Sequence, residues 1–197
     1  MDYDLIRKNF EKHGFATAFF SAGEEAVAYL AGKYSQRSIG FGGSLTLRQL
    51  GLYEALSKNN SVIWHHMVPG NETRHLCAHS KIYLTSANAV SMTGEIINID
   101  GEGNRVSMTL YGPDQVHFLI GRNKIAPDRD SAIYRARNTA APKNARRQNF
   151  KLPCAVTGDK CFDCNSPQRM CNATVIMDRA MRSLPTEVIF IDQDLGL

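Results

Sequence analysis

Short runs rich in apolar and aromatic residues alternate along the chain with longer stretches whose apolar residues recur every three or four positions. The short runs predict strands and the longer stretches predict helices. Strands are expected over residues 15–20, 38–42, 61–65, 81–85, 95–100, 115–121 and 187–191, and helices over residues 4–13, 23–34, 45–57 with a break near Gly51, 71–80 and 128–139. This alternation favours an α/β domain with a mostly parallel sheet. The strand over 95–100 follows its predecessor without an intervening helix, which predicts a local antiparallel pair.

The spacing of turn-forming residues divides the chain into three parts. We expect residues 1–150 to form the α/β core and residues 151–174 to form an irregular cysteine-rich segment. Residues 175–197 are expected to complete the core with a helix and a strand. The middle part is rich in residues that favour turns over regular elements, namely Pro153, Gly158, Asp159, Asp163, Asn165, Ser166 and Pro167.

Composition excludes several protein classes. Of the 197 residues, 43% are hydrophobic and 21% are charged, as in globular domains. The longest uncharged stretch, Ile82 to Gly94, is too short and too polar for a membrane span, which needs about 20 apolar residues. The N-terminus carries both charges and no apolar segment of the secretory type, so a cytoplasmic location is expected.

Positive charge is concentrated in one part of the chain. The net charge is +4, yet the stretch from Arg122 to Lys151 holds nine basic residues against Asp128 and Asp130. Such a stretch can bind an anionic small molecule, a nucleic acid or an acidic partner, or it can be a solvated helix face. Nucleic acid is the least favoured of these, because aromatic residues are not regularly interleaved.

Three glycine-containing loops follow predicted strands, at residues 40–46, 85–95 and 100–105. In open α/β sheets, ligands bind where strands end, and glycine lets a ligand approach the backbone. No Walker lysine follows the first loop, and each loop taken alone is also explained by turn chemistry or helix capping. Together they predict one anion-binding crevice formed by Gly42, Gly43, Ser44, Thr46, Asn88, Thr93, Glu95, Asn104, Arg105 and Lys124. Glu95 and Asp100 are the candidate catalytic carboxylates.

Two histidine pairs stand out. His65 and His66 are adjacent, so in a strand they would point to opposite faces. His75 and His79 share one face of a predicted helix, a spacing that can hold a metal. Surface or core histidines explain this second pair better, because no glutamate occupies the position between them that a zinc protease would require.

Four of the five cysteines lie close together near the C-terminus, at Cys154, Cys161, Cys164 and Cys171. In a reducing compartment such a group favours an iron–sulfur cluster or Zn²⁺, with redox-active thiols and disulfides as alternatives. The spacing matches neither a zinc ribbon nor a bacterial ferredoxin. The fifth, Cys77, is expected to be a small buried hydrophobe.

Several segments, in order along nearly the whole chain, resemble the LUD (lactate utilisation) domain family in its short, cysteine-containing branch. They are residues 42–46, 87–89, 93–96, 98–106, 121–125, 135–137, 141–144 and 153–171. The resemblance implies a three-layer α/β/α sandwich like that of the phosphosugar isomerases and CoA transferases. It also implies a part in the oxidation of lactate or a related organic acid, as a redox accessory or subunit beside an iron–sulfur or oxidoreductase partner.

A second hypothesis remains beside the first. The glycine loops could instead serve a small-molecule enzyme of the CoA-transferase or sugar-phosphate isomerase type. Whether the chain is catalytic on its own is left open, as is an oligomeric state.

Overall fold

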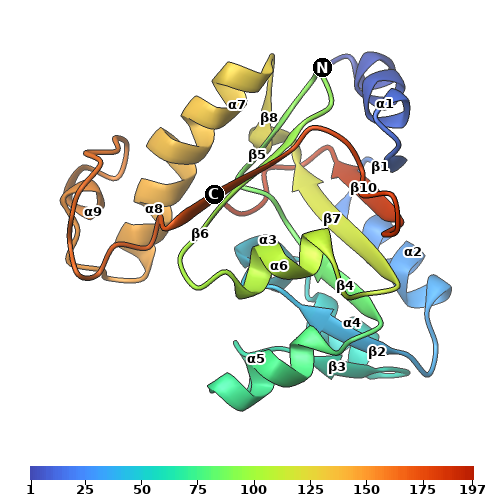
Figure 1. Ribbon diagram of the computed structural model, residues 1–197. Helices are drawn as coiled ribbons and strands as arrows, with labels where there is room; N and C mark the ends of the chain where they lie inside the picture. Colours follow the sequence, from blue (N-terminus) through green and yellow to red (C-terminus); the bar gives the residue numbers. More distant parts are fainter.

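The computed structural model describes residues 1–197 and is built around a six-stranded sheet (Figure 1). Its strand order is β1-β10-β7-β4-β2-β3, and every neighbouring pair is parallel. The strands are β1 (Ala16–Phe20), β2 (Ser38–Phe41), β3 (Ser61–Ile63), β4 (Ile82–Thr85), β7 (Gln115–Gly121) and β10 (Thr186–Ile191). The carboxyl ends of all six strands therefore meet at one edge.

Helices cover both faces of this sheet, which confirms the three-layer α/β/α arrangement. Alternate residues of β7 show the division: Phe118 packs in one cluster and Leu119 in another. On the Leu119 face lie α2 (Gly23–Lys33), α3 (Leu45–Gln49) and α4 (Leu52–Ser57). On the Phe118 face lie α1 (Tyr3–Lys12), α5 (Asn71–Ala78) and α6 (Asn104–Leu110). Gly51, with φ of 62°, separates α3 from α4 where a break was expected.

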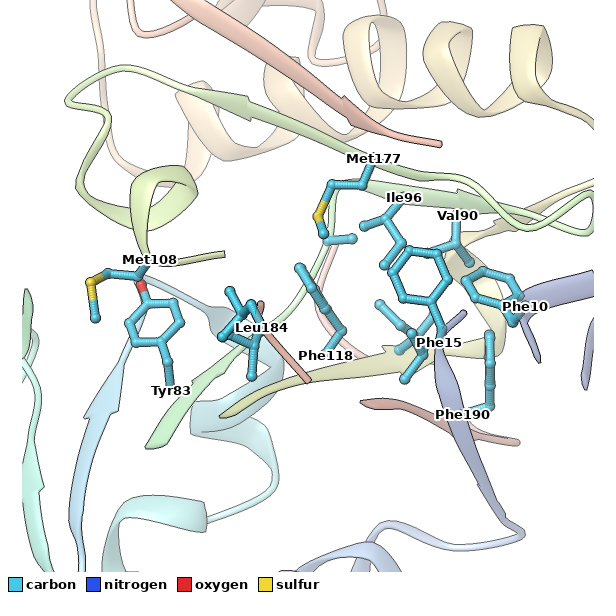
Figure 2. Packing of buried hydrophobic residues seen from close by; sticks show 14 of the residues in the cluster. Phe10, Phe15, Tyr83, Val90, Ile96, Met108, Phe118, Met177, Leu184 and Phe190 are labelled. Carbon is cyan, nitrogen blue, oxygen red and sulfur yellow. The ribbon is translucent and has the colours of Figure 1, made fainter. Parts of the chain in front are cut away.

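A second, smaller sheet packs against the Phe118 face and was not expected. Its order is β8-β5-β6-β9, formed by β5 (Ala89–Ser91), β6 (Ile96–Asp100), β8 (Ile125–Ala126) and β9 (Ala173–Met177). Figure 2 shows Val90, Ile96 and Met177 of this sheet facing Phe118 and neighbouring aromatic residues. The expected antiparallel pair exists, but β6 pairs with β5 rather than with β4.

A long helical stretch covers the outer face of the second sheet. It consists of α7 (Arg129–Arg135), the π-helical turn η2 (Ala136–Ala140) and α8 (Ala141–Arg147). Small alanines make the contact, because Ala132, Ala136 and Ala141 pack on Ala89 and Ile97. The chain continues into the short α9 (Pro153–Thr157) and an irregular stretch.

The last part of the chain completes both sheets, with β9 in the small one and β10 in the large one. It contains these two strands rather than the expected helix and strand. The 3-10 turn η1 (Arg122–Lys124) carries the chain out of β7. Every helix is too short or too polar to cross a bilayer.

Candidate functional site

A cavity of about 440 Å³ opens at the carboxyl edge of the large sheet. Loops after β2, β3, β4 and β7 reach it, which is where ligands bind in open α/β sheets. The cysteine-rich segment and the end of α8 form the opposite wall. Its polar lining includes Ser44, His65, His66, Arg74, Ser86, Asn88, Asp100, Glu102, Asn104, Arg105, Lys124, Asn144, Arg147, Gln148, Gln168, Arg169 and Asn172.

The lining is predominantly basic. It contains five basic residues, Arg74, Arg105, Lys124, Arg147 and Arg169, against the two acids Asp100 and Glu102. A cavity lined mainly by one sign of charge concentrates ligands of the opposite sign. The arrangement therefore suits an anion.

The first glycine loop brings backbone and imidazole groups together. The indole Nε1 of Trp64 donates to the carbonyl oxygen of Gly42 at 3.1 Å, which fixes the loop against the chain that follows β3. A Cβ atom at Gly43 would lie only 3.3 Å from Nε2 of His66. Glycine at this position therefore lets the two histidines approach the loop. Ser44 caps α3 by accepting a hydrogen bond from the amide of Leu47 at 3.3 Å.

His65 and His66 both line the cavity, so the expectation that they point to opposite faces is wrong. The reason is that β3 ends at Ile63, before the pair begins. The two rings lie 4.6 Å apart, and Nδ1 of His66 is buried without a hydrogen-bond partner. Burial, assisted by His65 and nearby arginines, lowers the pKa of His66 to about 4. This imidazole is therefore neutral at physiological pH, and its Nδ1 is available to form a hydrogen bond with a ligand.

Arg105 is held rigidly in one wall of the cavity. Its terminal nitrogens donate to Ser86 O, Ile99 O, Asn88 Oδ1 and Asn98 Oδ1. Its Nε lies 3.3 Å from Oδ2 of Asp100. The guanidinium therefore supplies positive charge to the cavity, while its N–H groups are already engaged by the protein.

Lys124 is the most deeply buried basic residue of the cavity, with 4% of its surface exposed. Its Nζ donates to Oγ1 of Thr46 and to Oγ of Ser86, at 2.8 Å in each case. Burial lowers the pKa of Lys124 to about 7, and the positive charges of Arg135 and Arg105 contribute to this shift. The amine is therefore about half protonated near neutral pH.

Hydrogen bonds hold the cysteine-rich segment against the preceding helical stretch. Arg146 on α8 donates to the carbonyl oxygens of Ala155 and Val156. Asn138, in the π-helical turn, accepts the amide of Cys161 at 3.0 Å. Little apolar surface anchors the segment, because only Leu152 and Cys154 within it are buried hydrophobic residues. Hydrogen bonds thus order a stretch that its composition alone would not.

Arg169 organises the inner part of the same segment. It donates to the carbonyl oxygens of Cys164 at 2.6 Å and of Cys171 at 3.1 Å, and it pairs with Asp163 at 2.9 Å. Both Arg169 and Cys171 line the cavity. One guanidinium therefore links the thiol-bearing loops to the cavity wall.

The four clustered cysteines are free thiols. Burial and the neighbouring thiols raise the pKa of Cys154, and the same causes raise the pKa of Cys171 to about 11. Four thiols form a donor set that soft metals favour. In this conformation no three His, Cys, Asp or Glu side chains are arranged to hold an ion. The donor chemistry thus fits a metal, and the sulfurs would have to draw closer together to bind one.

Comparison with known proteins identifies the family. The sequence matches the LUD domain over residues 3–191. This chain belongs to the LUD domain family. A DUF162 family protein from Deinococcus radiodurans, known from its crystal structure, is similar with a TM-score of 0.53 and 13% sequence identity. The alignment covers 96% of this chain and 95% of that chain, and at this identity it shows the shared fold alone. No curated protein matches the sequence.

Most of the predicted crevice residues of this LUD domain do converge. Gly43, Ser44, Asn88, Asn104, Arg105 and Lys124 line the cavity. Thr46 lies behind Lys124 and contacts it, and Gly42 lies beside Arg105, whose Cγ would be 3.1 Å from a Cβ at that position. The glycine loops therefore form one site with the basic residues.

Thr93 and Glu95 lie elsewhere in the LUD domain, at the turn between β5 and β6. Thr93 donates to the Glu95 carboxylate at 2.6 Å, and His13, the residue that caps the C-terminus of α1, contacts the carbonyl oxygen of Gly94 at 3.0 Å. These contacts fasten the hairpin to α1, outside the cavity. Asp100 does line the cavity, where it pairs with Arg105 and accepts the amides of Glu102 and Gly103.

Sequence reasoning missed several lining residues of the LUD domain site. Arg74 comes from the middle of α5 and Arg147 from the end of α8, while Gly196 and Leu197 come from the chain after β10. Helical basic residues carry no signal that separates a cavity wall from a solvated face. His75 and His79 are both exposed, and Cys77 is buried as expected.

Proposed function

We propose that this LUD-domain chain binds a small organic acid and takes part in the oxidation of lactate or a related acid, as a redox accessory or subunit. The family is associated with lactate utilisation. The observation that carries the proposal is the basic cavity whose wall includes Cys171 and Arg169 of the cysteine-rich segment. The acid site and the thiol cluster are therefore adjacent parts of one molecule.

The acid would be bound by charge and by the polar groups that the protein leaves available. Arg147 and Arg74 line the cavity, and Nε of Arg74 is buried without a partner. A carboxylate suits such a donor, because a hydrogen bond between two charged groups is stronger than one between neutral groups. The unpartnered His66 Nδ1 adds a polar group that can orient a hydroxyl.

In this proposal Cys154, Cys161, Cys164 and Cys171 hold an iron–sulfur cluster or Zn²⁺. A cluster would supply electron transfer, whereas zinc would supply order to the segment. The protein's own residues set the surroundings: Arg169 fixes the loops that carry Cys164 and Cys171. A partner oxidoreductase would accept the electrons that oxidation of a hydroxy acid releases.

The CoA-transferase or isomerase alternative has less support. It needs a carboxylate fixed inside the cavity, but Glu95 lies outside it, and the side chain of Glu102 at the cavity wall is exposed to solvent. Asp100 is already paired with Arg105 and with two backbone amides.

The proposal is tested by calorimetry and by metal analysis of anaerobically purified protein. We expect L-lactate or pyruvate to bind, propane-1,2-diol to bind far more weakly because it lacks the carboxylate, and Arg147→Gln to weaken acid binding. We expect iron with sulfide, or zinc, in wild-type protein and not in Cys161→Ser, with Cys77→Ala as the control that retains the metal. A chain that binds no organic acid contradicts the acid site, and a metal-free reduced chain contradicts the thiol centre.

A further inference from the structure

We propose that Lys124 captures the carbonyl group of a small oxo acid as a covalent imine. The inference rests on the proposed acid-binding function and names a substrate class for it, an acid whose carbonyl lies close to its carboxylate. It assigns to Lys124 the role of a nucleophile.

The hydrogen bonds of Lys124 leave its lone pair available. Ser86 Oγ donates its own hydrogen to the carbonyl oxygen of Leu119 at 2.6 Å, so it faces Nζ of Lys124 as an acceptor. Thr46 Oγ1 is the second acceptor, at 2.8 Å. A neutral amine has two N–H bonds, and these two hydroxyl oxygens accept both. With its N–H bonds engaged in this way, the amine can direct its lone pair at a carbonyl carbon.

The surroundings make the neutral amine available near neutral pH. No side-chain carboxylate lies within ion-pair distance of Lys124, and Asp100 of the cavity wall is paired with Arg105. The guanidinium groups of Arg135 and Arg105 disfavour a third positive charge nearby. A desolvated lysine beside other cationic groups is the usual setting of an amine nucleophile.

The chain after β10 covers the amine. Gly196 lies so close that a Cβ atom there would be 2.8 Å from Nζ of Lys124 and 2.5 Å from Oγ1 of Thr46. Its amide donates to Gln49 Oε1 at 2.6 Å, and the amide of Leu195 donates to Asn123 Oδ1 at 3.0 Å. These bonds hold a backbone strap over the nucleophile. Because Lys124, Gly196 and Leu197 all line the cavity, a small molecule there reaches the amine beneath the strap.

The basic lining selects the rest of the substrate. A carboxylate on the basic wall leaves the neighbouring carbonyl carbon to the amine. Nζ forms a bond to that carbon, and the carbonyl oxygen leaves as water with the two hydrogens of the amine. The reaction is balanced without another reagent and is reversible.

The test is reductive trapping on the full chain with pyruvate and sodium cyanoborohydride, followed by peptide mass spectrometry. We expect an adduct on the Lys124 peptide at least about a hundredfold above that on exposed Lys143, because exposed lysines are almost entirely protonated at neutral pH. Lactate, which lacks the ketone, should give no adduct. Hydroxyacetone, which lacks the carboxylate, should give much less, and Lys124→Met should abolish the pyruvate adduct.

Calorimetry with the same acids separates the two proposals. Pyruvate that binds without forming a Lys124 adduct overturns the imine and leaves the acid site standing. A chain that binds neither pyruvate nor lactate overturns the proposed function, and hydroxyacetone then tests the amine alone. Adducts spread evenly over the exposed lysines would also contradict the inference. This measurement needs only the wild-type chain.

Discussion

Nε of Arg105 lies 3.3 Å from Oδ2 of Asp100, and both side chains are nearly buried, with 12% and 8% of their surfaces exposed. The pair joins the start of α6 to the end of β6 at the cavity wall. Because Arg105 also donates to Asn88 and Asn98, it holds three segments in register. The pair therefore shapes the cavity as well as charging it.

Arg105→Met should lower the free energy of unfolding by about 3–5 kcal/mol, because it leaves Asp100 buried without its partner. Urea denaturation measures this loss. The double variant Arg105→Met with Asp100→Asn should recover part of it, since the unpaired charge is then removed as well. An equal loss in the single and double variants would contradict the pairing.

Lys124 should make the free energy of unfolding increase as the pH rises. Its pKa is about 7 in the folded chain, whereas a lysine in the unfolded chain has a pKa of about 10.4. Between these values the unfolded state binds more protons, so stability rises with pH, by at most about 1.4 kcal/mol per pH unit. Denaturation curves of wild type and Lys124→Met at pH 7 and pH 9 should diverge, with wild type gaining. Parallel curves would show that the amine is charged in both states.

The buried pair His117 and Glu187 lies near the amino ends of β7 and β10, opposite the cavity, and should govern the stability of the fold in acid. Nδ1 of His117 lies 2.8 Å from Oε2 of Glu187, which also accepts from Lys33 at 2.9 Å. Burial raises the pKa of Glu187, but hydrogen bonds from His117, Lys33 and Tyr29 outweigh it and lower the value to about 2.

A carboxylate whose pKa is lower in the folded than in the unfolded chain stabilises the fold at pH values above its unfolded pKa. It loses that contribution as the pH falls. Wild type should therefore lose about 3 kcal/mol relative to Glu187→Gln between pH 5 and pH 2. Acid titration followed by circular dichroism at several urea concentrations checks this. An unchanged difference between the two proteins across that range would contradict it.

Cys161→Ser should release the metal and expose the cysteine-rich segment to protease, because metal binding contributes its free energy to folding. Limited proteolysis with metal analysis measures both effects, and cleavage should fall between Lys151 and Cys171. Cys77→Ala serves as the control, since Cys77 lies in the core near Phe41. Equal protease resistance in wild type and Cys161→Ser would contradict a metal-ordered segment.

The large sheet could be predicted because buried parallel strands have simple patterns. The strand ending at Phe41 and the helix beginning at Gly23 each have a clear pattern of apolar residues. The small sheet could not, because β5 is three residues long and its sequence, Ala89–Ser91, is too short to distinguish from a turn. The hairpin of β5 and β6 places Glu95 next to α1. The position of Glu95 in the sequence, which favoured the cavity, therefore did not predict where this residue lies in the fold. Thr46 and Gly196, which lie far apart in the sequence, meet only through the fold.

Gly196→Ala should abolish imine trapping at Lys124 while leaving the fold intact. Its φ of +71° makes alanine cost about 1–2 kcal/mol, and the new methyl group would press on Nζ of Lys124 and Oγ1 of Thr46. Gly103→Ala is the matched control, because Gly103 has a similar φ of +82° and open space around its Cβ position. Both variants should remain folded in thermal melts, with the larger loss of stability in Gly196→Ala because of the new close contacts, and only Gly196→Ala should lose the pyruvate adduct. Equal trapping in the two variants would show that the strap does not reach the amine.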